Sequence, residues 1–182
     1  VYNLSAAIAC INSLDIEIEE IIKYIPHLEK INGRVNTLQN KKGAKIILDY
    51  AHTLNATKEI LTYANKIKKG KIITVVGAAG GREKEKRKHI GKLVSDLSDE
   101  VIFTMDDPRY EKVSNINKEL EQNIIKNNFI NIINRKKAIK TAIKKGNKND
   151  LILILGKGTD NYMAIKNKYK KYNDLKIIKK YI

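Results

Sequence analysis

The sequence has little of several residue types that mark particular classes of protein. Its 182 residues include one cysteine, two prolines and no tryptophan, and only 6% are aromatic. A single cysteine excludes an internal disulfide, and Cys10, in the run AAIAC, is expected to be a small buried residue and not a catalytic thiol. No apolar run approaches the roughly 20 residues that cross a bilayer, and the first residues do not show the basic-then-apolar pattern of a signal peptide. We therefore expect a cytoplasmic protein that does not span a membrane.

Lysine dominates the charge of the chain, which has 36 Lys and Arg against 20 Asp and Glu and a formal net charge of +16. Such a balance suggests nucleic-acid binding. The lysines are, however, scattered among Asn and Ile, whereas a groove for single strands needs aromatic side chains interleaved with arginine. A basic nucleic-acid-binding α/β domain is therefore kept only as an alternative. The five arginines are informative in this background, because only a planar guanidinium binds a carboxylate or phosphate through two parallel bonds.

Strands and helices are expected to alternate along most of the chain. Apolar, β-branched runs predict strands at 45–49, 72–76, 100–104, 129–133 and 151–155. Helical periodicity predicts helices at 1–13, 15–24, 56–69, 86–97, 115–126 and 135–145. The chain is then expected to end with a helix over 160–170 and a short strand near 176–181. Strands separated by helices predict βαβ units and an α/β fold with a mostly parallel sheet.

Four segments with unusual residues each lie at the end of a predicted strand. They are LDYAHT at 48–53, GAAGGR at 77–82, DDPR at 106–109 and GKGTD at 156–160. The carboxyl ends of parallel strands meet at one edge of a sheet, where open α/β folds bind their ligands. None of the segments matches a dinucleotide fingerprint, and the lysine of GKGTD precedes its second glycine, so no P-loop is predicted. Taken singly, the acidic residues would also suit helix caps or turns.

Together these segments resemble the Mur ligases, as do VYNLSAAIA at 1–9 and INGRVNT at 31–37. The resemblance covers essentially the whole chain in the order and spacing of the family. It implies that 31–182 form the Rossmann-like, three-layer, amino-acid-binding carboxy-terminal domain. Residues 1–30 would be a small helical remnant of the central ATP-binding domain. The P-loop and the amino-terminal domain of such a ligase have no counterpart here, and the chain does not begin with methionine, so we expect an inactive fragment.

The resemblance implies an ATP-dependent ligase of peptidoglycan synthesis that adds a diamino acid to UDP-N-acetylmuramoyl-L-alanyl-D-glutamate. The dipeptide carboxylate would attack the γ-phosphate of ATP, and the amine of the diamino acid would then attack the resulting acyl phosphate. ATP and Mg²⁺ are the implied cofactors, held mainly outside this chain. Catalysis by positioning needs no nucleophilic side chain, so no catalytic residue or metal ligand is expected here. A non-catalytic or amidotransferase-associated Mur-ligase-like protein is a second alternative.

The resemblance also implies roles for individual residues. Asn3 would lie against the adenine, Arg34 would reach the phosphates of ATP, and Asp49 and His52 would contact the nucleotide from the carboxy-terminal domain. Arg82 would bind the α-carboxylate of the incoming amino acid. The other residues expected to contact that amino acid are Asp106, Asp107, Pro108, Arg109, Gly156 and Asp160. Both signs of charge would then meet at one sheet edge, as a zwitterionic ligand requires.

Three residues depart from the D-N-P-R and G-K-G-H-E motifs of the family. Asp107 stands in place of Asn, Thr159 in place of His, and Asp160 in place of Glu. Arg109 keeps the guanidinium that would bind a second carboxylate, which favours meso-diaminopimelate or a similar acceptor. The altered 156–160 loop resembles lysine-adding relatives instead. Both acceptors stay open, with diaminopimelate ahead of L-lysine.

Overall fold

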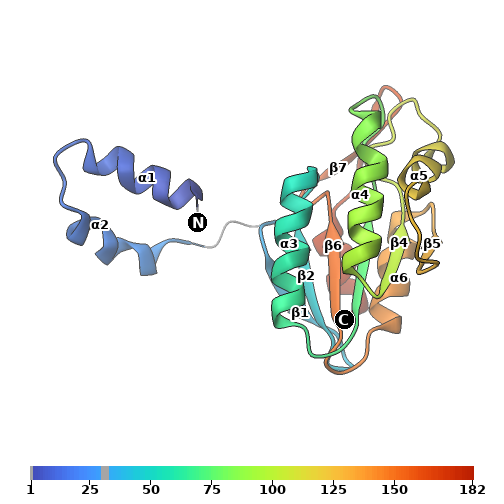
Figure 1. Ribbon diagram of the computed structural model, residues 1–182, viewed down its shortest axis with the longest axis horizontal. Coiled ribbons are helices and arrows are strands. Elements are labelled where there is room, and N and C mark those ends of the chain that lie inside the picture. The colour runs from blue at the N-terminus through green and yellow to red at the C-terminus, as the bar shows by residue number, and fades with distance from the viewer. Residues whose placement is uncertain (1, 30–32) are drawn as a thin grey trace. The chain divides into compact units, whose positions relative to one another are not determined.

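The computed structural model describes residues 2–29 and 33–182, which lie in two compact units, Val1–Ile31 and Asn32–Ile182 (Figure 1). The first unit contains α1 (Tyr2–Asn12), α2 (Ile18–Tyr24) and the short 3-10 helix η1 (Ile25–His27). Cys10 is exposed on α1, so the prediction of a buried cysteine was wrong. Two short helices by themselves have too little surface to bury it. The origin of this unit in a central ATP-binding domain stays a prediction.

The second unit is built on a six-stranded sheet with the order β1-β2-β6-β3-β4-β5. The strands are β1 (Asn36–Gln39), β2 (Lys45–Asp49), β3 (Ile72–Val76), β4 (Glu100–Phe103), β5 (Phe129–Asn131) and β6 (Leu151–Leu155). Only β1 is antiparallel to its neighbour, which confirms the predicted α/β fold with a mostly parallel sheet. The two central strands, β3 and β6, are buried along their whole length, which agrees with the unbroken apolar sequence LILIL of β6.

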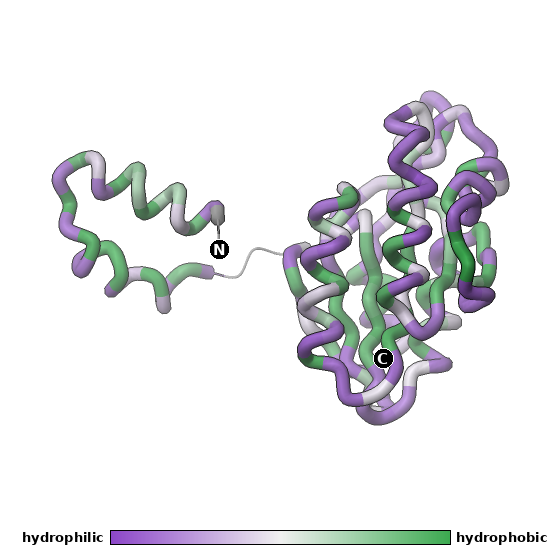
Figure 2. Tube along the Cα trace, viewed as in Figure 1, coloured by the Kyte–Doolittle hydropathy of each residue, from purple (hydrophilic) through white to green (hydrophobic). Residues whose placement is uncertain are grey.

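Helices cover both faces of this sheet and give the predicted three layers. On one face lie α3 (Leu54–Ile67), α4 (Lys84–Leu97) and α5 (Val113–Glu121) (Figure 1). On the other lie α6 (Arg135–Lys145) and α7 (Asp174–Tyr181), which share the second core. Alternate residues of β6 serve the two cores: Leu153 packs with the first set of helices and Ile154 with the second. The central strands of the sheet are mainly hydrophobic, whereas the outer helices are mixed (Figure 2). Burial of each Leu or Ile side chain in these cores stabilises the folded state by about 1.5–3 kcal/mol relative to leaving that side chain exposed.

The carboxy-terminal segment differs from the sequence prediction. In place of a helix over 160–170 there is a hairpin of β7 (Tyr162–Ile165) and β8 (Lys168–Lys171), joined by a two-residue turn with Lys166 at a φ of +52°. In place of a terminal strand there is α7, whose N-cap Asn173 accepts the Lys176 N–H. The edge strand β1 was not predicted either, because its sequence, NTLQ, is short and polar. No helix in the described part of the chain is long and apolar enough to cross a membrane.

Candidate functional site

A cavity of about 460 Å³ lies where β2, β3, β4 and β6 end. The parallel register pairs Asp49 with Leu155 and Val76 with Phe103, so four neighbouring strands release the chain at one edge of the sheet. All four strand-end segments contribute to the lining, which includes Tyr50, His52, Arg82, Asp106, Asp107, Lys157 and Asp160. The structure therefore brings together most of the residues that the motifs singled out, as the rule for open α/β sheets requires.

Most charged groups that line the cavity are already paired, but Arg82 and Asp106 are not. Among the described residues, neither side chain takes part in a hydrogen bond or an ion pair. Arg82 is exposed, whereas Asp106 is only 7% exposed. Burial raises the pKa of Asp106 to about 6, against the opposing influence of nearby Arg135 and Lys157. The cavity therefore offers one free guanidinium and one free carboxyl group.

The glycine loop after β3 and the DDPR segment after β4 touch through their backbones. The Gly80 N–H donates to the Asp107 carbonyl at 3.0 Å, and a Cβ at Gly80 would lie 2.0 Å from the Pro108 carbonyl oxygen. Gly156 has a similar part in the loop after β6, because it adopts a φ of +109° and a Cβ there would lie 2.2 Å from Asp106 Oδ2. Glycine and proline at these positions shape the cavity by letting its walls approach closely.

The β7–β8 hairpin holds the DDPR segment in an unusual conformation. Asp107 and Arg109 both have positive φ, +39° and +51°, which is costly for residues with a Cβ and common at ligand sites. The Arg109 N–H donates to the Ala164 carbonyl at 3.0 Å, and the Arg109 carbonyl accepts the Lys166 N–H at 2.7 Å. The buried Nε of Arg109 has no partner among the described residues. The hairpin thus positions residues that the sequence had already pointed to, although the hairpin itself was not predicted.

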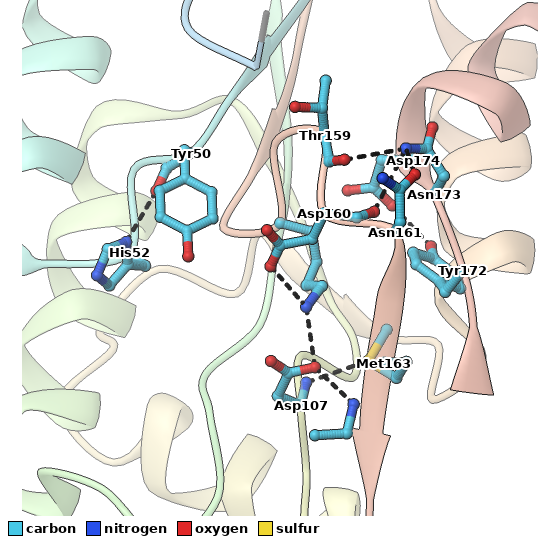
Figure 3. A network of polar contacts seen from close by, with 12 residues as sticks. Tyr50, His52, Asp107, Thr159, Asp160, Asn161, Met163, Tyr172, Asn173 and Asp174 are labelled. Atoms are coloured by element: carbon cyan, nitrogen blue, oxygen red, sulfur yellow. Dashed lines mark hydrogen bonds and ion pairs between the residues drawn. The ribbon is translucent and has the colours of Figure 1, made fainter. Parts of the chain in front are cut away.

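Lys157 is a charged residue of the cavity that the sequence analysis did not single out. Its Nζ lies 2.9 Å from Asp107 Oδ1 and 3.0 Å from Asp160 Oδ2. Figure 3 labels these two aspartates, and dashed lines run from both of them to one nitrogen atom. The side chain is 1% exposed. Burial alone would lower the pKa of Lys157, but the hydrogen bonds to these aspartates and the nearby charge of Asp106 together outweigh it and raise the pKa. The sequence feature that could have pointed to Lys157 is its place between two glycines, directly after a strand covered on both faces.

Arg87 is the second charged residue that the motifs did not mark as part of the site. Its guanidinium, 2% exposed, forms ion pairs with Glu111 and Glu119 at 2.7–2.8 Å. It also donates to the carbonyl oxygens of Ala79 and Arg82, at 2.8 and 3.3 Å. The hydrogen bond to Arg87 lowers the pKa of Glu111 to about 2. An arginine kept in a lysine-rich chain was the signal for this role.

The residues expected to contact the nucleotide fall into three groups. His52 and Arg34 both meet Tyr50: the His52 ring packs edge-on at 4.9 Å, and the Arg34 guanidinium lies 5.1 Å above the tyrosine ring. The carboxylate of Asp49 is only 7% exposed and accepts two backbone N–H groups, those of residues 35 and 51, so it braces the end of β2. Asn3 is exposed on α1, in the first unit.

Comparisons with known proteins agree on one family. A sequence model described as "Mur ligase, glutamate ligase domain" matches residues 33–158. The UDP-N-acetylmuramoyl-L-alanyl-D-glutamate–2,6-diaminopimelate ligase 2 of Clostridium acetobutylicum is 36% identical over 180 residues, which are 98% of this chain and 37% of the relative. A solved ligase of the same description superposes with a TM-score of 0.78 at 26% identity, over 99% of this chain and 37% of the other.

A more distant match adds support for the fold. The MurF ligase of Thermotoga maritima, solved with ADP, has a TM-score of 0.60 at 22% identity and covers 84% of this chain and 33% of the other. The 182 residues therefore span little more than a third of the length of the proteins they resemble.

Proposed function

The chain belongs to the Mur ligase family, and from this premise we propose that it is the amino-acid-binding part of an ATP-dependent ligase of peptidoglycan synthesis. The whole enzyme would join a diamino acid to UDP-N-acetylmuramoyl-L-alanyl-D-glutamate through an acyl phosphate. The cytoplasm is the proposed location. Of this reaction, the present residues would bind and orient the attacking amino acid, so that its amine meets the acyl phosphate in a productive geometry.

The free pair of Arg82 and Asp106 is the observation that carries the proposal. An α-amino acid is a zwitterion: its carboxylate suits a guanidinium, and its ammonium suits a carboxylate. The cavity leaves one group of each sign unpaired, in a site whose other charged side chains already form ion pairs. The pKa of Asp106 is raised to about 6, so the carboxyl group is still mostly ionised at neutral pH. In that form it would accept hydrogen bonds from the ammonium of the amino acid.

The second end of the acceptor would be bound by the loops after β4 and β6. The unpartnered Nε of Arg109 supports a carboxylate there, as does the naming of curated relatives for 2,6-diaminopimelate. Asp107 and Asp160 would contact the distal amine, while Pro108 and Gly156 would shape the wall. We therefore propose a meso-diaminopimelate-like acceptor ahead of L-lysine.

The nucleotide would meet this unit at the cluster of Arg34, Tyr50 and His52. The aromatic rings suit a planar base or ribose, and the guanidinium suits a phosphate. Asp49 would act by holding the end of β2, and Asn3 would contribute from the first unit. No group of three or more His, Cys, Asp or Glu suited to a metal is found among the described residues. Mg²⁺ and the phosphate-binding loop are proposed to belong to other parts of the ligase.

Phosphate release by the full-length protein tests this function. We expect release from ATP only when the UDP-sugar dipeptide and a diamino acid are both present. L-Alanine, which has no second amine, is the matched control acceptor. Failure with every diamino acid would contradict the proposal, and salt-sensitive DNA binding without any response to ATP would favour the nucleic-acid alternative. The 182 residues alone should not turn over ATP.

A further inference from the structure

The ammonium of Lys157 occupies the place between Asp107 and Asp160 that a ligand ammonium would otherwise take. It donates one hydrogen bond to each aspartate, at 2.9 and 3.0 Å, and it lines the cavity although its side chain is 1% exposed. The face of Tyr162 lies 5.1 Å from the same nitrogen. A lysine ammonium has three N–H donors, and two of these have acceptors among the described residues. One donor is therefore left for a ligand.

The position of the ammonium is set by the backbone and not by a flexible surface chain. Gly156 and Gly158, on either side of Lys157, adopt φ values of +109° and +50°. Asp107 Oδ1 also accepts the Ala164 N–H of the hairpin at 2.8 Å. The three charged groups are thus held by three different segments: the loops after β4 and β6 and the β7–β8 hairpin. Buried polar groups that satisfy one another in this way make the structure around them more rigid.

Charge counting shows what the lysine changes. Asp107 and Asp160 without a cation would carry two negative charges and would suit a bare ammonium, such as the end of L-lysine. With Lys157 between them the cluster carries one net negative charge, and both carboxylates already accept a cation. A distal end with a carboxylate and an ammonium could use the free N–H of Lys157 and the outer oxygens of the aspartates. A bare ammonium can use only the outer oxygens of the aspartates, because it has no group that accepts the free N–H of Lys157.

We propose that Lys157 is a specificity-determining residue: by occupying the Asp107–Asp160 pair, it selects acceptors whose distal end carries both a carboxylate and an amine over acceptors with an amine alone. This inference rests on the proposed function and concerns the same cavity. It assigns a task to Lys157, a residue of the GKGTD segment to which the sequence analysis gave no role and which is not part of the free pair of Arg82 and Asp106.

Two substitutions in the full-length ligase should move the selectivity in opposite directions. Lys157→Met removes the cation and keeps the aliphatic stem, so the ratio of kcat/KM for meso-diaminopimelate to that for L-lysine should fall by about tenfold or more. Asp107→Asn removes one negative charge and leaves a neutral cluster, so the same ratio should rise. Lys157→Arg retains the charge and serves as the matched control, with a ratio that stays nearest to that of the unsubstituted enzyme.

The direction of the change separates specificity from structural support. A purely structural role would lower the use of both acceptors in parallel in Lys157→Met and Asp107→Asn, and that result would overturn the proposal. Lys157→Met leaves two carboxylates without their cation, which lowers stability whatever the role of Lys157. Asp107→Asn buries no new charge and therefore gives an independent measurement. A ratio that does not rise in Asp107→Asn would also overturn the proposal.

Binding measured without ATP distinguishes failure of this inference from failure of the proposed function. Calorimetric titration of the full-length protein with meso-diaminopimelate and with L-lysine gives the same ratio from dissociation constants. Opposite shifts in the two variants, seen in binding even where no turnover occurs, would support the role of Lys157 while contradicting the ligase reaction. If neither amino acid binds to the unsubstituted protein, both proposals fail together.

Discussion

Arg87 and Glu111 form an ion pair with two parallel bonds, Nη1 to Oε2 at 2.8 Å and Nη2 to Oε1 at 2.9 Å. The same guanidinium holds the carbonyl oxygens of Ala79 and Arg82, and Glu111 accepts the Gly81 N–H. One buried pair therefore fastens the glycine loop after β3 to the segment after β4. Arg82, which would bind the acceptor carboxylate, is positioned by a residue that need not touch the substrate.

Arg87→Lys is predicted to impair acceptor binding more than ATP binding. A lysine keeps the charge but has no planar fork, so it cannot serve Glu111 and the two carbonyl groups together. Displacement of Arg82 should raise the KM for the acceptor by about tenfold or more, while the KM for ATP changes little. Initial rates of the full-length enzyme measure both. Lys92→Ala, which removes an exposed pair with Asp96 on the same helix, is the control and should leave both constants unchanged.

Arg82→Ala and Arg109→Ala are predicted to weaken use of the acceptor far more than use of ATP. Each removes a charge-assisted hydrogen bond worth about 1.5–3 kcal/mol, or roughly one to two powers of ten in kcat/KM. Arg34→Ala is the matched control, because its guanidinium lies over Tyr50 at the nucleotide cluster. That variant should raise the KM for ATP instead. Comparable losses for both substrates in Arg109→Ala would remove Arg109 from the acceptor site.

Asp174→Asn is predicted to destabilise the fold strongly. Asp174 and Arg135 are both fully buried, and Arg135 Nη2 lies 2.7 Å from Asp174 Oδ2. The Tyr172 hydroxyl donates a hydrogen bond to the other oxygen of the Asp174 carboxylate. Without the negative charge, the Arg135 guanidinium would remain buried and unpaired, which costs about 3–5 kcal/mol in the free energy of unfolding. Urea unfolding of the chain measures this value.

An exposed ion pair gives the comparison for that experiment. Glu100 pairs with Lys145 at 2.5 Å, with side chains 30% and 45% exposed. Glu100→Gln should change the free energy of unfolding by less than about 1 kcal/mol. A loss for Asp174→Asn no greater than that for Glu100→Gln would show that the buried pair contributes little.

Asp106→Asn is predicted to stabilise the ligand-free protein, with a dependence on pH. Burial raises the pKa of Asp106 from 3.8 to about 6, so between these values the folded state binds more protons than the unfolded state. The stability of the unsubstituted protein should therefore fall as pH rises through this window. The shift of about two pKa units corresponds to roughly 3 kcal/mol.

The measurement is the free energy of unfolding of both proteins between pH 4 and pH 8. The advantage of Asp106→Asn should be small at pH 4, grow up to about pH 6 and then level off. In the full-length enzyme the same change should weaken acceptor binding, because the free carboxylate is lost. A constant stability difference across this range would rule out a titrating Asp106.

The sequence by itself determined the layers of the fold and the edge at which the site lies. The run LILIL at 151–155 is apolar at every position, so it suits only a strand covered on both faces. The carboxyl ends of neighbouring parallel strands lie at one edge of the sheet, so the four segments come together there whichever residues they contain. These features follow from local composition and from order along the chain.

Only the tertiary structure decided which charges remain free and which are paired. Lys157 meets Asp107, 50 positions earlier, and that contact depends on the β7–β8 hairpin, whose mixed polar sequence has no clear periodicity. The backbone bonds of Arg109 to Ala164 and Lys166 favour the hairpin over the predicted helix. The energy of an ion pair depends on separation and burial, which residues distant in sequence acquire only when the chain has folded. For this reason the motifs indicated the site, whereas its free Arg82 and Asp106 became visible only in three dimensions.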